Sequence, residues 1–425
     1  MTYNLKRHAG GPSVGHEGRQ GKTDGSLLDV DSELDSQTTI DTIVNSLQAN
    51  GHTVHLVEAT AELPHWFLTH TVDLVFNIAE GIHGMHRESQ VPAILELLGV
   101  PFTGSNSITL ALALDKAKTK QILTSENIPT PRWQLFPTPT TALNRQLEFP
   151  LIVKPNREGS SKGIWRESVV GDEPSLRRQV ARIYERYHQE VLVEEFIDGL
   201  ELTVGVLGHN PLPILEVDFS SCQASGEFFY SWRMKEFQGD AAMGLIPALH
   251  CPARLDGPTT ERVHAVALHA HRALGCSDFS RTDIRLSADG VPYVLEVNPL
   301  PGLNPLDSNF PMMSRAAGLS HAALVQRIVE LAMVRYHHTS PPAPAVGEGR
   351  TMVPLQESSS SSVSFDPSTR SSANLAGGSL LRAQSQAEIN GLSKRSESKD
   401  GANTPSAQGG PAQGRRMLTV SPVAP

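Results

Sequence analysis

Two carboxylates, a carboxamide and a guanidinium fall on one face of a predicted β-hairpin. Asp289-Gly290 lies between two β-type runs, which predicts a hairpin with a two-residue type I′ turn. Counting outward from this turn places Asp283 opposite Glu296 and Arg281 opposite Asn298. This set suits a hard divalent cation, because Mg²⁺ takes one or two protein carboxylates and completes its shell with phosphate oxygens and water.

A simpler explanation stays open at this point. A solvated strand face, or an ion pair between Arg281 and Asp283, would also account for these residues. A three-residue loop would shift the register by one and rearrange both faces. The opposite face is almost wholly apolar and is expected to be buried; it pairs Ala288 with Val291, Leu286 with Tyr293, Ile284 with Leu295 and Thr282 with Val297.

A lysine in a short apolar strand, followed by a glycine- and serine-rich loop, forms a second candidate site. Residues 150–155 read as a buried strand in which Lys154 needs an anionic partner to offset the cost of burial. The loop at 157–163 contains Ser160 and Ser161, and its backbone amides can cradle phosphate oxygens. It does not match the Walker pattern, because no GK[ST] opens a helix.

A third candidate is the extended segment Val191–Gly199, which contains Glu194 and Glu195. Such a segment can offer backbone groups to an adenine and a carboxylate to a ribose. A plain edge strand would explain it equally well.

Length and composition limit the class of protein. The 425 residues give room for two or three domains, and the net charge of −9 provides no electrostatic footprint for nucleic acid. Three cysteines without CxxC spacing indicate neither a disulfide framework nor a zinc site. No apolar run reaches membrane-spanning length and the polar N-terminus does not resemble a signal peptide, so we expect a cytoplasmic protein without a membrane partner.

Apolar periodicity predicts helices at about 40–50, 88–98, 107–126, 174–189, 259–274 and 314–337. It predicts strands at 53–57, 72–79, 202–207 and 212–217, with little helix between the first two. Ser107 is the expected cap of its helix, whose lysines would form a solvated face. The loop after the second strand lies where open sheets bind ligands, so Glu80, His83 and His86 are either ligand groups or a solvated loop.

Taken in order, the motifs resemble those of ATP-grasp ligases, and the D-alanine–D-alanine ligase branch most of all. They are Asp115-Lys116, Ile152–Pro155, Arg157–Ser161, Glu194–Glu201, Arg281–Asp283, Glu296–Asn298 and Leu300–Gly302. The resemblance implies an α/β protein, α+β in the ATP-grasp part: a small open α/β N-terminal domain followed by a two-lobed ATP-grasp fold with antiparallel sheets.

From the composition and this resemblance together we expect four segments. Residues 1–38 would be poorly ordered or hold an incomplete first strand, although Gly10–Glu17 can also be read as a phosphate or substrate loop. Residues 39–106 would form the N-terminal α/β domain on the substrate side, and 107–340 the ATP-grasp domain. Residues 341–425 would be a disordered low-complexity tail with almost nothing apolar to bury.

The resemblance also implies a role for each matching residue. The implied ATP contacts are Lys116 and Lys154 on the phosphates, Ser161 in the closing loop, Glu194, Glu195 and Ile197 in the adenine hinge, Glu201 on the ribose and Lys235 near the γ-phosphate. The implied ligands of two Mg²⁺ ions, with Mn²⁺ as an alternative metal, are Asp283, Glu296 and Asn298. The implied catalytic groups are Arg281, Ser160 and the Gly302 amide, and the implied substrate groups are Glu80 and Ser308.

The activity implied is ATP-dependent joining of two amino acids through an acyl phosphate, as in D-alanine–D-alanine ligase of peptidoglycan biosynthesis, with a homodimer as an expected assembly. The sequence departs from the family on the substrate side. Glu80 and Glu236 stand where the family has a histidine and a tyrosine, the stretch Gly302–Asn309 is one residue longer, and the first strand is short or missing.

Two alternatives follow from these departures. The chain could act on an unrelated small-molecule carboxylate, or bind nucleotide without turnover. The complete set of Arg281, Asp283, Glu296 and Asn298 argues against mere binding.

Overall fold

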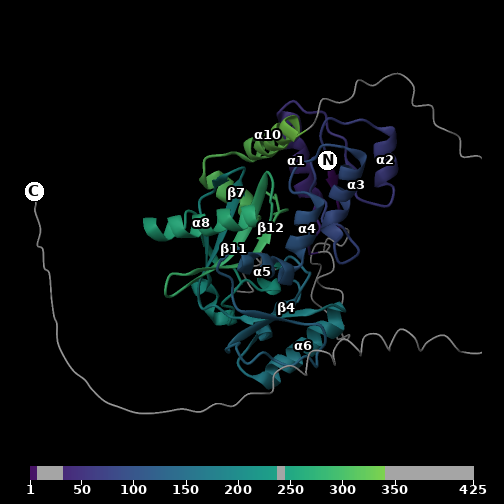
Figure 1. The fold of residues 1–425 in the computed structure, drawn as a ribbon. Coiled ribbons are helices and arrows are strands. Elements are labelled where there is room, and N and C mark those ends of the chain that lie inside the picture. Colours follow the sequence, from purple (N-terminus) through teal and green to yellow (C-terminus); the bar gives the residue numbers. More distant parts are fainter. Residues whose placement is uncertain (7–31, 237–244, 340–425) are drawn as a thin grey trace, which may run out of the picture. The chain divides into compact units, whose positions relative to one another are not determined.

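The computed structural model describes residues 1–6, 32–236 and 245–339. The predicted loop at Gly10–Glu17 and the predicted tail beyond residue 340 lie outside the described residues. Within this part of the chain, helices pack on small β-sheets (Figure 1).

The N-terminal part contains a short parallel strand pair with helices around it. β1 (Thr2–Tyr3) pairs with β2 (Val57–Glu58), so the expected first strand is present but short. The helices are α1 (Gln37–Ala49), α2 (Leu63–Thr69), the 3₁₀ turn η2 (Arg87–Ser89) and α3 (Gln90–Leu98).

Three expectations for this part were wrong. The strand predicted at 72–79 forms only isolated bridges, at Val75 and Asn77. The strand predicted at 53–57 begins only at Val57, and α2 occupies part of the segment expected to hold little helix. Pro64 stands in the first turn of α2, where its missing N–H costs nothing. Leu63 and Phe67 lie four residues apart on one face of α2 and are buried in the core of this part.

The helix expected from Ser107 to about Glu126 is divided in two. α4 (Ser107–Leu114) is capped by Asn106 rather than Ser107, and Asp115 interrupts the helix in an extended conformation. The Asp115 side chain then caps α5 (Lys116–Ser125) by accepting the Lys118 N–H at 3.1 Å. This break turns Lys116 into the first residue of a new helix.

Two antiparallel sheets follow, as predicted for this part of the chain. The smaller sheet has the order β3-β6-β4-β5. Its strands are β3 (Trp133–Phe136), β4 (Leu151–Pro155), β5 (Val169–Val170) and β6 (Val191–Glu195). Helix α6 (Glu173–Tyr187) packs on this sheet beside β4, after the 3₁₀ turn η3 (Arg166–Ser168) (Figure 1).

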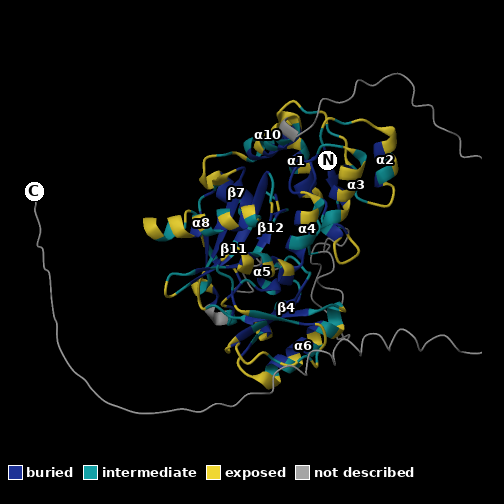
Figure 2. Cartoon of the chain, in the orientation of Figure 1, coloured by how far each residue is buried: buried dark blue, intermediate teal, exposed yellow. Residues whose placement is uncertain are grey.

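The larger sheet has the order β10-β9-β7-β11-β12, with β8 paired to β7. Its strands are β7 (Gly199–Leu207), β8 (Asn210–Pro211), β9 (Leu215–Asp218), β10 (Ala248–His250), β11 (Phe279–Ser287) and β12 (Pro292–Asn298). Helix α8 (Gly257–Ala273) covers one face of it, with an exposed outer side in Figure 2. The connection between β9 and β10 contains η4 (Phe219–Ser225) and α7 (Trp232–Glu236).

The hairpin of β11 and β12 differs from the prediction at its turn. Ser287 pairs with Val291 across a three-residue loop, because the Ser287 N–H donates to the Val291 carbonyl at 3.1 Å and Gly290 adopts φ +79°. The predicted two-residue turn is therefore wrong, and Ile284 faces Val294 instead of Leu295.

A β-bulge between the turn and the polar residues restores the predicted register. Beyond it, Asp283 faces Glu296 and Arg281 faces Asn298, as expected. The bulge falls at Leu295, which lines a cavity instead of joining the buried apolar face, while Val294 is fully buried against α8.

The closing helix predicted at 314–337 is also two helices, α9 (Asn309–Ala316) and α10 (His321–Thr339). Gly318, at φ +86°, lies in the break between them. No single helix of the described residues is long and apolar enough to cross a membrane, although α9 and α10 together, bent by 100°, pass the length and composition test.

Candidate active site

A cavity of about 840 Å³ has walls from both sheets. Strands β4 and β6 line it on one side and β7, β11 and β12 on the other, with residues 32–36 and 300–309 at its margin. Most of the residues singled out from the sequence line this cavity: Glu80, Lys154, Ser160, Ser161, Glu194, Glu195, Ile197, Glu201, Lys235, Arg281, Asp283, Glu296, Gly302 and Ser308. Lys116 and Asn298 are not among the lining residues, but each contacts one of them.

The polar face of the hairpin forms one wall. Arg281 donates from Nε and Nη2 to the two oxygens of Asp283, at 2.9 and 2.8 Å. The amide nitrogen of Asn298 donates to Asp283 Oδ2 at 3.1 Å. The Arg281–Asp283 ion pair considered from the sequence therefore exists, and it exists beside Glu296 inside a cavity rather than on a solvated face.

Glu296 is surrounded by positive charge. Lys116 Nζ lies 3.1 Å from its Oε2. Burial alone would raise the pKa of the Glu296 carboxyl, but the charges of Lys116, Lys154, Lys235 and Arg281 lower it well below its usual range. Glu296 is therefore ionised and faces Asp283 across the hairpin.

This donor set fits a divalent cation of the Mg²⁺ type. The described residues contain no cluster of three or more His, Cys, Asp or Glu side chains that could hold a metal ion by themselves. Two facing carboxylates and an amide oxygen are nevertheless what Mg²⁺ uses when phosphate oxygens and water supply its other ligands. A softer metal such as zinc is usually held by histidine or cysteine ligands, which this set lacks.

Lys154 has the anionic partner that its buried strand predicted. Its ammonium pairs with Glu194 Oε1, and Lys120 Nζ lies 2.6 Å from Glu194 Oε2. Burial lowers the pKa of Lys120 to about 8, although Glu194 acts in the opposite direction. One carboxylate thus compensates two lysines and leaves a net positive charge beside the cavity.

The solvated lysine face predicted for this helix was wrong for Lys116 and Lys120, which are both buried. Lys120 was missed as a site residue. Its spacing of four residues from Lys116 puts both ammonium groups on the same face of α5, and this was the available signal.

The end of β6 and the start of β7 form the wall expected to hold adenine and ribose. The Glu195 carboxylate pairs with Arg132 at 2.8 Å. Glu201 pairs with Arg285 at 2.9 Å, and the Arg285 guanidinium lies 5.1 Å from the centre of the Phe196 ring. Phe196 lies within the adenine hinge that the resemblance implied, whereas Arg285 was assigned no role from the sequence.

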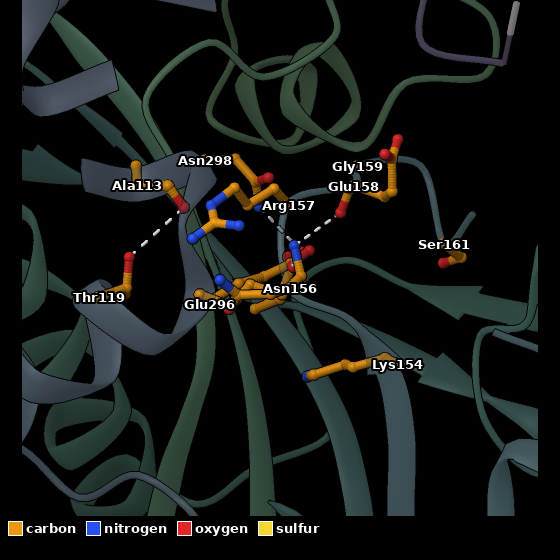
Figure 3. A network of polar contacts seen from close by, with 12 residues as sticks. Ala113, Thr119, Lys154, Asn156, Arg157, Glu158, Gly159, Ser161, Glu296 and Asn298 are labelled. Carbon is orange, nitrogen blue, oxygen red and sulfur yellow. Dashed lines mark hydrogen bonds and ion pairs between the residues drawn. The ribbon is translucent and has the colours of Figure 1, made fainter. Parts of the chain in front are cut away.

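The loop of residues 157–163, called here the serine loop, carries Ser160 and Ser161 with positive φ angles of 48° and 55°. Ser161 Oγ donates to the Tyr230 carbonyl at 3.0 Å. Lys116 Nζ donates to the Glu158 carbonyl at 2.7 Å. Figure 3 shows Gly159 and Ser161 on this loop and Lys154 on the strand before it. The loop is thereby held at the edge of the cavity, close to the charged groups of both sheets.

Lys235 enters the cavity from α7, where its Nζ lies 5.5 Å from the centre of the Tyr230 ring. Burial and the neighbouring Arg281 charge lower the pKa of Lys235. An anionic ligand beside this ammonium would offset the cost of its burial.

The remaining end of the cavity is acidic. Burial raises the pKa of the Glu80 carboxyl well above its usual range, and Glu88, Glu33 and Asp35 raise it further. Ser308 lies against Gly302, where an added Cβ would come within 2.9 Å of Ser308 Oγ. His83 and His86 are exposed and do not line the cavity.

Comparisons with known proteins agree with this geometry. A family model described as "D-ala D-ala ligase C-terminus" matches residues 122–330. The chain is 33% identical over 307 residues to an uncharacterized protein, y4sG, of Sinorhizobium fredii, covering 70% of this chain and 88% of the relative. It is 32% identical over 292 residues to a D-alanine–D-alanine ligase of Geotalea uraniireducens, covering 68% of this chain and 88% of that enzyme.

A solved structure is also similar. The D-alanine–D-alanine ligase from Bacillus anthracis complexed with ATP superposes with a TM-score of 0.58 at 28% sequence identity. The superposition covers 72% of this chain and 95% of that structure.

Proposed function

The chain belongs to the D-alanine–D-alanine ligase family of ATP-grasp enzymes and is thus an ATP-dependent ligase of small amino acids, and on that premise we propose that it joins two D-alanine molecules, or close analogues, into a dipeptide. The family uses ATP and a divalent metal; Mg²⁺ is the ion proposed for this chain. The cytoplasmic location and the homodimer stay predictions of the sequence.

One observation carries the proposal more than any other. Asp283 and Glu296 face each other across a hairpin, inside a cavity whose opposite wall presents Lys154. A triphosphate in this cavity would meet both ammonium groups and metal-binding carboxylates. A protein that only bound a nucleotide would gain little from this arrangement beside Arg281.

The reaction has two steps. A carboxylate oxygen of the first amino acid attacks the γ-phosphorus of ATP, the bond to the bridging oxygen of ADP breaks, and an acyl phosphate forms. The free amine of the second amino acid then attacks the acyl carbon, loses its proton, and expels phosphate. Each step gathers negative charge on oxygen atoms, and preorganised donors stabilise such charge without rearranging.

We assign particular side chains of this molecule to the stabilisation of that negative charge. Lys154 and Lys116 neutralise phosphate oxygens, Lys235 the transferred phosphoryl group, and Arg281, with the Gly302 N–H, the reacting carboxyl. Support comes from the positions of Lys154, Lys235 and Arg281 on the cavity wall. A bound divalent cation at Asp283, Glu296 and Asn298 would add further positive charge to the phosphates.

Water must be kept from the acyl phosphate, because hydrolysis would waste ATP. The serine loop is assigned to this task. Ser161 is tied to the Tyr230 carbonyl, so the loop spans from one lobe to the segment that carries Lys235. Exclusion of water also strengthens each electrostatic contact inside the cavity.

The amino-acid sites are assigned to the acidic end, with Glu80 near the first ammonium group and Ser308 near the second carboxylate. Both side chains line the cavity. Because Glu80 stands where the family has a histidine, the first site presents a buried carboxyl in place of an imidazole.

A screen of purified full-length protein tests the proposal. ATP and Mg²⁺ are supplied with single amino acids and with pairs, and phosphate and dipeptide are both measured. Phosphate and dipeptide formed together with D-alanine support the proposal. Turnover only with an unrelated carboxylate would replace the substrate assignment, and no turnover with any acceptor would leave a nucleotide-binding protein.

A further inference from the structure

A carboxylate far away in the sequence is buried against the serine loop. The Glu33 side chain is 8% exposed and accepts the Gly159 N–H through Oε1 at 2.5 Å. Arg87 donates to both Glu33 oxygens, at 2.6 and 2.8 Å. Glu33 lies four residues before the start of α1, so the segment that leads into this helix reaches the loop across more than one hundred residues of chain.

Charge is balanced around this contact. Lys162, in the loop itself, lies 2.7 Å from Glu158 and 3.6 Å from Glu33, and Arg87 lies 3.4 Å from Glu158. Burial raises the pKa of Glu33, but the charges of Arg87 and Lys162 lower it below its ordinary value. Two carboxylates and two cations therefore form a compensated group, in which loss of one member leaves a buried charge unpaired.

The fit between Glu33 and the loop depends on a glycine. An added Cβ at Gly159 would lie 2.8 Å from Glu33 Oε1, closer than ordinary contact allows. The φ of Gly159 is negative, so alanine fits the backbone there, and its Cβ would force the end of the Glu33 side chain to move. The absence of a side chain at Gly159 therefore leaves the space that the Glu33 carboxylate occupies.

The neighbouring residue contacts the other loop at the cavity. Ser32 Oγ accepts the Trp232 Nε1–H at 3.2 Å, and Trp232 begins the helix that carries Lys235. Ser161 connects the same two loops through the Tyr230 carbonyl. Residues 32 and 33 therefore contact both segments that close on the reacting groups.

We propose that Glu33 is a positioning residue that holds the serine loop closed over the activated carboxyl, and that it thereby determines how much acyl phosphate reaches the amine instead of water. The inference rests on the proposed function, because it presumes an acyl phosphate. Water that attacks the acyl carbon would release phosphate and regenerate the free amino acid, so each lost intermediate costs one ATP and yields no dipeptide.

Glu33→Gln in the full-length protein tests the proposal. Glutamine keeps the size of the side chain but removes the charge that Arg87 and Lys162 require. We expect the ratio of phosphate to dipeptide to rise at least threefold, with KM for ATP changed less than twofold. Glu330→Gln, an exposed change on α10, should leave the ratio unaltered. A Glu33→Gln enzyme with the wild-type ratio would overturn the proposal, even if its rate were lower.

A double-mutant comparison examines the contact itself. Gly159→Ala should raise the same ratio in the wild-type background, because the new Cβ displaces the Glu33 carboxylate. In a Glu33→Ala background the displaced group is absent, so adding Gly159→Ala should change the ratio no further. Independent, multiplying effects of the two changes would show that Glu33 does not act through this loop.

Hydrogen exchange separates this inference from the proposed function. The backbone amides of residues 157–163 should exchange at least tenfold faster in Glu33→Gln than in wild type, with ATP present in both. If wild type makes no dipeptide but the exchange difference is found, the proposed function fails and the positioning by Glu33 stands. Equal exchange in the two proteins would refute the positioning whatever the activity.

Discussion

Opposite charges are paired at short distance throughout the cavity. Asp283 pairs with Arg281, Glu296 with Lys116, and Glu201 with Arg285. Such pairs add little to stability on balance, since desolvation opposes the attraction. Their effect is on function: they hold carboxylates ionised and cations oriented in a cavity where a ligand with many negative charges can displace part of the pairing.

The residue on which the metal assignment depends most is Glu296. Glu296→Gln keeps the shape of the side chain but removes a charge that faces both Asp283 and Lys116. We expect kcat to fall by about 10²-fold or more, in line with the loss of one preorganised electrostatic group. The rate of phosphate release at saturating substrate measures kcat. A variant that turns over at a near-normal rate would exclude Glu296 as a metal ligand.

Asp35 gives a pH dependence of stability with a definite sign. Burial, with Asp307 nearby, raises the pKa of its carboxyl from 3.8 to about 7. The folded chain then holds this proton more tightly than the unfolded chain, so its contribution to stability falls as pH rises from about 4 to about 7, and stays low above that.

Asp35→Asn should therefore raise the free energy of unfolding at about pH 8 by roughly 1–3 kcal/mol, allowing for the partial exposure of the side chain. The gain should be smaller at about pH 5 and close to zero below about pH 4. Urea unfolding at the three pH values measures it. The exposed Asp41→Asn serves as control, and an equal gain at every pH would rule out the titration of Asp35 as the cause.

At the scale of elements, the β11–β12 hairpin shows how a local feature positions the site. Its loop needs Gly290 at φ +79°, a conformation that L side chains rarely adopt. We expect Gly290→Ala to lower the free energy of unfolding by about 1 kcal/mol with little loss of activity, because the bulge at Leu295 lies between the loop and the polar residues. Thermal unfolding and turnover measure the two effects.

Gly257→Ala is the matched control. Gly257 begins α8 with ordinary φ, and an added Cβ would meet no atom within 4 Å. Alanine there should be neutral or slightly stabilising. Equal destabilisation by both changes would show that the Gly290 effect does not come from its backbone conformation.

The hairpin also shows what sequence reasoning can and cannot find. Counting outward from the Asp-Gly turn predicted the Asp283–Glu296 pairing correctly, yet the turn was wrong by one residue and the bulge was unforeseen. The longer loop and the bulge shift the register in opposite directions, so the pairing of Asp283 with Glu296 is unchanged. Type I′ turns and three-residue loops share the same Asp-Gly signal, so the sequence does not distinguish them; in the structure Val294 packs in the core cluster that includes α8 residues.

Contacts between residues far apart in the chain could not be predicted from the sequence. Lys120 was taken as a solvated lysine, because its partner Glu194 lies on another strand. Glu33 belonged to a segment expected to be poorly ordered, and its partners Arg87 and Gly159 come from two other elements. Motif order, in contrast, predicted the antiparallel sheets and most of the lining residues, because each motif lies within one strand or loop.

At the scale of the whole molecule, the cavity is built from both sheets, so a ligand that contacts both must oppose their separation. Lys154 and Glu194 come from the smaller sheet, while Asp283 and Glu296 come from the larger. ATP with Mg²⁺ should therefore raise the thermal midpoint of unfolding, and at a ligand concentration of about 100 times Kd the stabilisation should reach about 2.7 kcal/mol.

Addition of EDTA should remove most of this shift and leave the smaller effect of ATP on the lysines. Glu296→Gln should show only that smaller effect with or without EDTA, because its metal ligand is lost while Lys154 is kept. Differential scanning fluorimetry of the wild type and the variant, each with ATP alone and with ATP and Mg²⁺, measures all four states. If Glu296→Gln keeps the full Mg²⁺-dependent shift, the metal does not bind at the hairpin. The ligand would then not connect the two sheets through this metal site.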